Sequence, residues 1–229
     1  MILNSLKEFV VELLFPVQCQ SCARDSAYLL CNSCAKQLLT SRCVRCQSLL
    51  RAGFCGRCAS IMRVSGFRAL APYALVKQWI TCNKLDLASK SQLMDSKLFE
   101  EFFDEIMVNL NQPLSIEFVP SQEGSNWTSK VLPLSVAKRI GPPSLHRIAG
   151  QAAQKYLNRE ERTSQKIRLF KESSSKVINT NTVLLIDDVM STGASLDSCI
   201  SKLLGLGYRK VYVLVFAYQK MLSEENYGP

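Results

Sequence analysis

Residues 183–195 read V-L-L-I-D-D-V-M-S-T-G-A-S. The first four residues form an apolar run of the kind that fills a buried parallel strand. Two carboxylates, Asp187 and Asp188, stand where that strand is expected to end. Small and hydroxyl side chains with one glycine then lead into a helical pattern over residues 196–206. The chain is therefore organised around a strand, a pair of acids and a loop at a helix N-terminus.

A loop of this composition can bind a phosphate. Backbone N–H groups at a helix N-terminus point at the anion, and the helix dipole favours its negative charge. The paired acids just before the loop can accept hydrogen bonds from sugar hydroxyls. The alternative is an ordinary capped helix, with Ser191 or Thr192 as the cap, but a cap needs one hydroxyl and no paired acids. The pattern therefore predicts a site for a phosphorylated sugar.

Eight of the ten cysteines form four Cys-x-x-Cys pairs, and eight residues separate each pair from the next. They are Cys19, Cys22, Cys31, Cys34, Cys43, Cys46, Cys55 and Cys58. Two such pairs can complete a tetrahedral zinc site, so we expect one or two structural Zn²⁺ ions. Disulfides are disfavoured if the chain is cytoplasmic. The spacing leaves the ligand pairing open, because neighbouring pairs, or alternate pairs, could share a site.

We expect a cytoplasmic protein without a membrane span. No apolar run reaches the ~18 residues that a span needs. Residues 1–15 have helical apolar spacing that charged residues interrupt, and no small-residue cleavage site follows, which disfavours a signal peptide. We expect an amphipathic helix that packs on the protein, and a helix on a membrane surface is the alternative. The formal net charge of +9 overstates the case for nucleic-acid binding, because each zinc ion with four thiolates adds about −2 to the net charge. Six arginines could still contact nucleic acid, or could be solvated residues: Arg42, Arg45, Arg51, Arg57, Arg63 and Arg68.

Strands and helices are expected to alternate after the cysteines. The expected strands cover residues 68–73, 115–120, 177–186 and 211–217, and the expected helices cover 75–86, 93–110, 136–140 and 145–157. This order predicts an α/β fold, with a mostly parallel sheet flanked by helices and a small N-terminal cysteine-rich zinc module. We place the module in residues 1–66 and the sheet domain in residues 67–229. A ligand is expected at the carboxyl ends of the strands.

The stretch 183–195 resembles the phosphoribosyl pyrophosphate (PRPP) motif of type I phosphoribosyltransferases. In that family the two acids hold the ribose hydroxyls, and the loop wraps the 5′-phosphate. The resemblance implies a type I phosphoribosyltransferase-like sheet and a PRPP site, with Mg²⁺ coordinated mainly by PRPP oxygens. The implied PRPP-binding residues are Asp187, Asp188, Val189, Ser191, Thr192, Gly193, Ala194 and Ser195.

The chain as a whole resembles the ComF family of competence-associated proteins. The similarity rests on L-L-F-P at residues 13–16, the cysteine pairs, the PRPP motif, and Lys84, which stands where the family has a lysine after its first helix. The resemblance implies transfer of a phosphoribosyl group to an unknown acceptor, with Asp187, Asp188 and Lys84 as catalytic residues. It also implies a role in DNA uptake and natural transformation, with single-stranded DNA and DNA-uptake proteins as partners.

Residues 121–130 depart from the family pattern. They read S-Q-E-G-S-N-W-T-S-K, where the family has a second V-P step and basic residues. An insertion explains the difference, with Lys138 and Arg139 as the displaced basic residues. In type I enzymes this region stabilises the leaving pyrophosphate, so the resemblance leaves a second function open. That alternative is a non-catalytic protein that binds PRPP or a nucleotide, together with single-stranded DNA or a partner.

Overall fold

The computed structural model describes residues 18–39, 43, 46, 48, 55–84, 93–110, 114–121, 127–141, 143–147, 170–172 and 180–219. The helix expected over residues 1–15 and most of the helix expected over 145–157 lie outside these ranges. Within the described residues, no helix is long and apolar enough to cross a membrane.

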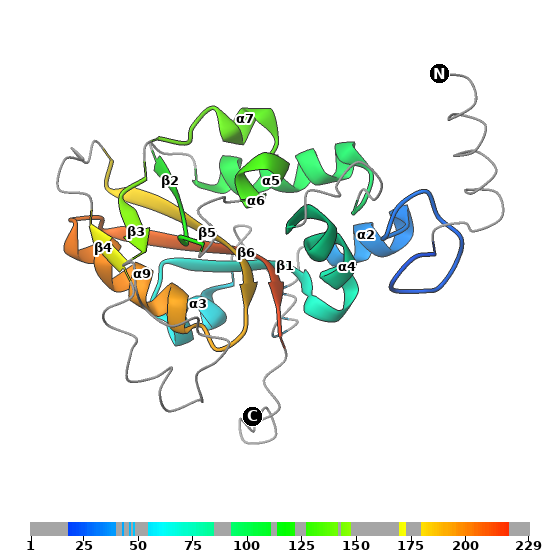
Figure 1. Cartoon of the computed structure of the whole chain (residues 1–229), viewed down its shortest axis with the longest axis horizontal. Coiled ribbons are helices and arrows are strands. Elements are labelled where there is room, and N and C mark those ends of the chain that lie inside the picture. The colour runs from blue at the N-terminus through cyan, green and yellow to red at the C-terminus, as the bar shows by residue number, and fades with distance from the viewer. Residues whose placement is uncertain are drawn as a thin grey trace.

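Four parallel strands form the central sheet in the order β1-β6-β5-β2 (Figure 1). They are β1 (Gly66–Pro72), β2 (Leu114–Phe118), β5 (Thr182–Met190) and β6 (Lys210–Tyr218). The two central strands, β5 and β6, are buried along most of their length, which requires apolar residues on both faces. The predicted α/β class, with a parallel sheet flanked by helices, is confirmed.

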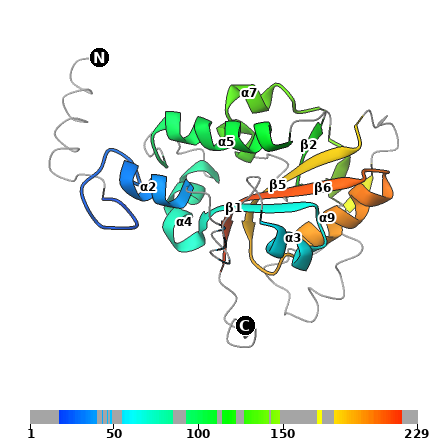
Figure 2. The same cartoon turned by 180° about the vertical axis from the view of Figure 1, so that it is seen from behind.

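Helices cover both faces of the sheet (Figures 1 and 2). On one face lie α4 (Tyr73–Lys84), α5 (Ser96–Leu110), α6 (Trp127–Val131) and α7 (Leu134–Ala137), with α2 (Asn32–Leu39) packed against the same core; on the other lie α3 (Gly56–Met62) and α9 (Ala194–Gly205). Successive strand side chains point to opposite faces. Leu184 and Ile186 therefore pack with the α4–α5 side, and Val183 and Leu185 pack with the α9 side.

Helix α4 confirms the helix expected over residues 75–86, although it begins and ends two residues earlier. Its buried residues, Val76, Trp79, Ile80 and Asn83, follow the spacing of an amphipathic helix. Burial of this face fixes the helix on the sheet, and Lys84 is its last residue. The division of the chain into residues 1–66 and 67–229 stays a prediction.

The prediction of a helix over residues 145–157 is wrong for its first three residues. Leu145–Arg147 form strand β3, which pairs antiparallel with β4 (Phe170–Glu172). Leu145 is buried in the core shared with α9. Pairing with a distant segment and burial of one side chain therefore outweigh the local helical spacing on which the prediction rested.

Candidate functional site

Strand β5 carries both acids and runs past them to Met190. It was expected to end at Ile186, but its pairing with β6 continues as far as Met190, opposite Tyr218. Pairing with β2 stops earlier, where Phe118 lies opposite Ile186. Among the described strands, β5 is therefore paired only with β6 from Asp187 onward. The two acids lie at the place where this edge of the sheet opens.

Asp187 and Asp188 follow the alternation of β5 and belong to opposite faces of the sheet. Asp188 continues the side of Ile186, which packs with α4 and α5. Asp187 continues the side of Leu185, which packs with α9. The two acids are adjacent in sequence, but the strand places them on opposite faces of the sheet and therefore in different environments.

Asp188 meets donors from two helices. The ammonium of Lys84, at the end of α4, lies 2.5 Å from its Oδ2 atom. The indole N–H of Trp127, the first residue of α6, donates to the same oxygen at 3.4 Å. The backbone N–H of Val189 donates to Oδ1 at 2.6 Å. The carboxylate is therefore held by its own strand on one side and by α4 and α6 on the other.

Asp187 is half-buried and has a raised pKa. Burial is the larger cause, and the negative charge of Asp188 adds to it, while Lys84 acts in the opposite direction. The backbone N–H of Asp188 donates to its Oδ1 atom at 2.9 Å. On the α9 side, burial and the charges of Asp187 and Glu117 raise the pKa of the Cys199 thiol. Asp187 thus lies in a protected setting, where its ionised form is costly.

The loop after β5 has the conformation of an open helix N-terminus. Gly193 is the residue before α9, with φ of +76°. Because glycine has no side chain, this residue cannot cap the helix with a side-chain hydrogen bond. That left-handed conformation suits glycine because it has no Cβ. The hydroxyl of Thr192 accepts from the N–H of Ala194 at 3.4 Å, and Ser191 and Thr192 are exposed. Such a helix start presents backbone donors to an anion.

The eight repeated cysteines form two groups, and neighbouring pairs share each group. The first group is Cys19, Cys22, Cys31 and Cys34, and the second is Cys43, Cys46, Cys55 and Cys58. The alternative of alternate pairs is therefore not the arrangement observed. Within each group the four Sγ atoms lie within 4.8 Å of one another, so each group could hold a metal ion.

The sulfur distances fit tetrahedral zinc. Two sulfurs at 2.3 Å from a shared zinc ion lie about 3.8 Å apart. The distance is 3.8 Å between Cys22 and Cys31, 3.7 Å between Cys43 and Cys58, and 3.4 Å between Cys46 and Cys55. Backbone N–H groups also donate to the sulfurs, as Cys58 does to Cys55 at 3.3 Å. None of the ten cysteines forms a disulfide in this structure.

The first cysteine group contacts the helices on the Asp188 side. Gln20 donates to Gln78 of α4 at 3.3 Å, and the backbone N–H of Leu30 donates to the carbonyl of Leu93 at 2.8 Å. Arg24 donates to the sulfur of Cys22 at 3.3 Å. This hydrogen bond lowers the pKa of the Cys22 thiol to about 6.

The second cysteine group belongs to the core on the other face. Cys43, Cys55 and Cys58 are buried among sheet residues such as Phe67. The backbone N–H of Cys55 donates to the carbonyl of Phe67 in β1 at 2.8 Å. Arg63, the residue directly after α3, contacts Asp197 in the first turn of α9 at 3.2 Å. Contacts thus connect the second cysteine group, through α3 and Arg63, to helix α9.

The sequence patterns did not single out two buried residues, Trp127 and Glu117. Trp127 lies in the stretch read as an insertion, and its buried ring gives no periodic signal. Glu117 is 1% exposed and accepts from the backbone N–H and hydroxyl of Ser144, at 3.0 and 2.5 Å. A lone acid among the apolar residues of β2 is the signal that could have found it.

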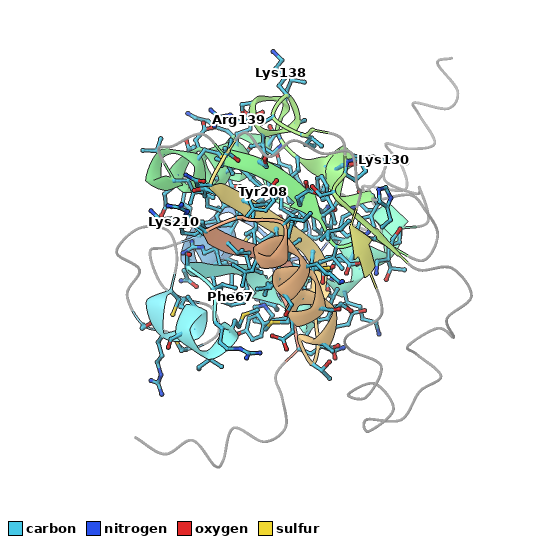
Figure 3. All side chains as sticks on the ribbon, turned by 90° about the vertical axis from the view of Figure 1, so that its left-hand side faces the viewer. Phe67, Lys130, Lys138, Arg139, Tyr208 and Lys210 are labelled. Carbon is cyan, nitrogen blue, oxygen red and sulfur yellow. The ribbon has the colours of Figure 1, made fainter. Side chains whose placement is uncertain are left out.

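Of the basic residues proposed for pyrophosphate, Lys84 contacts Asp188. Lys138 and Arg139 are exposed just after α7, and Lys138 points outward (Figure 3). Among the six arginines considered for nucleic acid, Arg68 is 2% exposed and lies 5.3 Å from the ring of Phe102, so it is a core residue.

The described residues define an α/β protein with a parallel sheet, two four-cysteine groups and an acid pair beside an open helix N-terminus. No family model and no curated protein matches this sequence.

Proposed function

We propose that the chain binds PRPP, or a closely related phosphorylated ribose, where β5 meets α9. The supporting observation is the arrangement of this junction: two acids at an open sheet edge, directly before a glycine-led helix N-terminus. Asp187 and Asp188 hold the ribose hydroxyls, as carboxylates accept from hydroxyl donors. The segment from Ser191 to Ser195 holds the 5′-phosphate, with the N-terminus of α9 directed at its charge.

Mg²⁺ enters with PRPP in this proposal and takes most of its ligands from PRPP oxygens. The donor set near the acids fits such a role. Asp188 is already in contact with Lys84, and Asp187 is half-buried, so the two carboxylates offer few oxygens for an all-protein magnesium site.

Each cysteine group holds one Zn²⁺ ion in this proposal, with a structural role. The sulfur separations of 3.4 to 3.8 Å support it. A structural zinc site closes all four coordination positions with protein ligands. The two sites join the N-terminal segment to opposite faces of the sheet.

The chemistry proposed is phosphoribosyl transfer to an unknown acceptor, in a cytoplasmic ComF-like protein that acts in DNA uptake and natural transformation. The resemblance of the acid pair, the loop and Lys84 to the family pattern supports this assignment. Lys84 would stabilise the charge that develops on the leaving pyrophosphate, since preorganised charges at that position lower the barrier.

A non-catalytic role is the second candidate, and the positions of the basic residues favour it. Lys138 and Arg139 are exposed, and Lys84 is engaged by Asp188. In this role the chain binds PRPP or a nucleotide and contacts single-stranded DNA or a DNA-uptake partner.

Calorimetry with PRPP and Mg²⁺ on the zinc-loaded full chain tests the site. We expect binding by the wild type, and its loss in the Asp187→Asn, Asp188→Asn double variant. The exposed Asp104→Asn variant on α5 is the matched control and should bind normally. Undiminished affinity in the double variant would remove the proposed site.

Release of pyrophosphate separates the two functions. PRPP with candidate nucleobases and amines should yield pyrophosphate if the chain is a transferase. Binding without turnover, together with salt-sensitive binding of single-stranded DNA, would instead favour the non-catalytic role.

A further inference from the structure

We infer that Lys84 and Trp127 form a clamp on Asp188, and that a phosphorylated ribose binds by displacing Lys84 while Trp127 keeps its place. This inference rests on the proposed function, because it assigns Asp188 to the ribose. Trp127 is then a positioning residue. Lys84 is a counter-ion of the site that changes partner when the ligand arrives.

Trp127 is the fixed part of the clamp. Its side chain is buried, and its ring lies 5.4 Å from Trp79 of α4 and 5.7 Å from Phe216 of β6, measured between ring centroids. Rings packed in this way keep one orientation, since moving them opens a void in the core. The indole N–H is therefore held toward Asp188, where it donates at 3.4 Å.

Lys84 is the movable part. It ends α4, and its side chain is 45% exposed. A lysine ammonium on a flexible, partly hydrated chain can leave an ion pair at little cost. Lys84 can thus exchange partners, whereas Trp127 cannot.

Both donors use the same oxygen of Asp188. Lys84 and Trp127 contact Oδ2, while Oδ1 accepts from the backbone of Val189. A ribose hydroxyl that donates to this carboxylate therefore competes with Lys84 for Oδ2. Once displaced, the ammonium remains beside the ligand and can pair with a diphosphate. The clamp accordingly favours PRPP over ribose 5-phosphate, because only PRPP carries a diphosphate with which the displaced ammonium can pair.

The Lys84→Met variant tests this exchange, with affinities measured by calorimetry in the presence of Mg²⁺. Ribose 5-phosphate should bind about two- to fivefold more tightly, because its competitor is gone. PRPP should bind about tenfold more weakly, because a charge-assisted contact to the diphosphate is lost. Opposite changes for the two ligands are a result that a general disturbance of the fold would not produce. Lys77→Met, an exposed position on the same helix, is the matched control and should leave both affinities unchanged.

The indole N–H resonance of Trp127 tests the fixed part without any ligand. The chain has two tryptophans, so a Trp79→Phe variant assigns the ¹⁵N-labelled signals. Asp188→Asn should shift the Trp127 signal, and ribose 5-phosphate should leave it in its hydrogen-bonded position.

Three other outcomes would each contradict a different part of the inference. A Trp127 signal that ignores Asp188→Asn overturns the clamp. Parallel or absent changes for the two ligands in Lys84→Met, with wild-type binding intact, overturn the exchange but leave the proposed function standing. A wild type that binds neither ligand overturns the proposed function and the exchange together.

Discussion

Arg63 donates to both carboxylate oxygens of Asp197, at 3.2 and 3.4 Å, and so joins the end of α3 to the first turn of α9. Asp197 lies one helical turn after Gly193, and its N–H donates to the Gly193 carbonyl at 2.9 Å. An acid in this turn repels any phosphate held by the loop. The guanidinium offsets that charge, and it also connects the second cysteine group with the candidate phosphate site.

Arg63→Ala is expected to weaken phosphate binding with little loss of stability. The two side chains are 79% and 40% exposed, so their pair contributes at most about 1 kcal/mol to folding. The uncompensated Asp197 should raise the Kd of ribose 5-phosphate about two- to fivefold, measured by calorimetry. Adding Asp197→Asn should restore the wild-type affinity. A double variant as weak as the single one would mean that Arg63 does not act by offsetting Asp197.

Asp187→Asn is expected to stabilise the protein above about pH 4. Burial and Asp188 raise the pKa of Asp187 above its ordinary 3.8, so the folded state holds this proton more tightly than the unfolded chain does. The ionised group therefore costs stability increasingly as the pH rises from 3.8 through the raised pKa. The variant removes that cost and should raise Tm by roughly 2–4 °C at pH 7.5.

Thermal unfolding between pH 4 and 8 measures this effect. The gain should shrink toward pH 4, where the native carboxyl is protonated and resembles the amide. Asp188→Asn should instead lower Tm at pH 7.5, because it loses the ion pair with Lys84. A gain independent of pH would show that Asp187 is not destabilising through its charge.

Glu117→Ala is expected to destabilise the fold by about 3 kcal/mol, because the two donors of Ser144 lose a buried, charged acceptor. Ser144→Ala should cost about 1–3 kcal/mol, since it removes one of those bonds. Urea denaturation measures both, and the double variant should cost less than the sum of the singles. Glu101→Ala, an exposed acid on α5, should be near neutral. Equal effects of the two glutamate variants would contradict a structural role for Glu117.

Purified chain is expected to contain about two zinc ions, measured by elemental analysis. Cys58→Ser should lower Tm more than Cys22→Ser, because Cys58 is buried in the core shared with the sheet, while Cys22 is exposed. Each variant should also lose about one zinc ion. A folded wild type without metal would contradict the zinc assignment.

The strand with its acids and loop was readable from residues 183–195, since an apolar run, a glycine and small polar residues are local signals. The length of β5 was not, because its last residues are held by pairing with β6 rather than by apolar character. The same limit explains β3: Leu145 has the spacing of a helix, but a distant strand and a buried site decide its conformation.

The cysteine pattern predicted one or two zinc sites but left the ligand pairing open, because the four pairs are evenly spaced. The contact of Gln20 with Gln78, which docks the first group on α4, involves no periodic pattern. The contacts of Asp188 with its donors likewise involve no periodic sequence pattern. Lys84 and Trp127 lie far apart in sequence, and only the packing of α4 and α6 on one face of the sheet brings them to the same oxygen.

The pairing of β1 with β6 sets the order in which the molecule can assemble. β1 begins at Gly66, and its partner strand ends at Tyr218, so a ribosome releases β1 long before the strand that pairs with it. Both cysteine groups are complete by residue 58 and can capture metal during synthesis. The sheet must wait for β6, and such distant pairing makes folding slow. Early metal capture would therefore give the nascent chain an ordered N-terminal anchor while its central sheet is still unfinished.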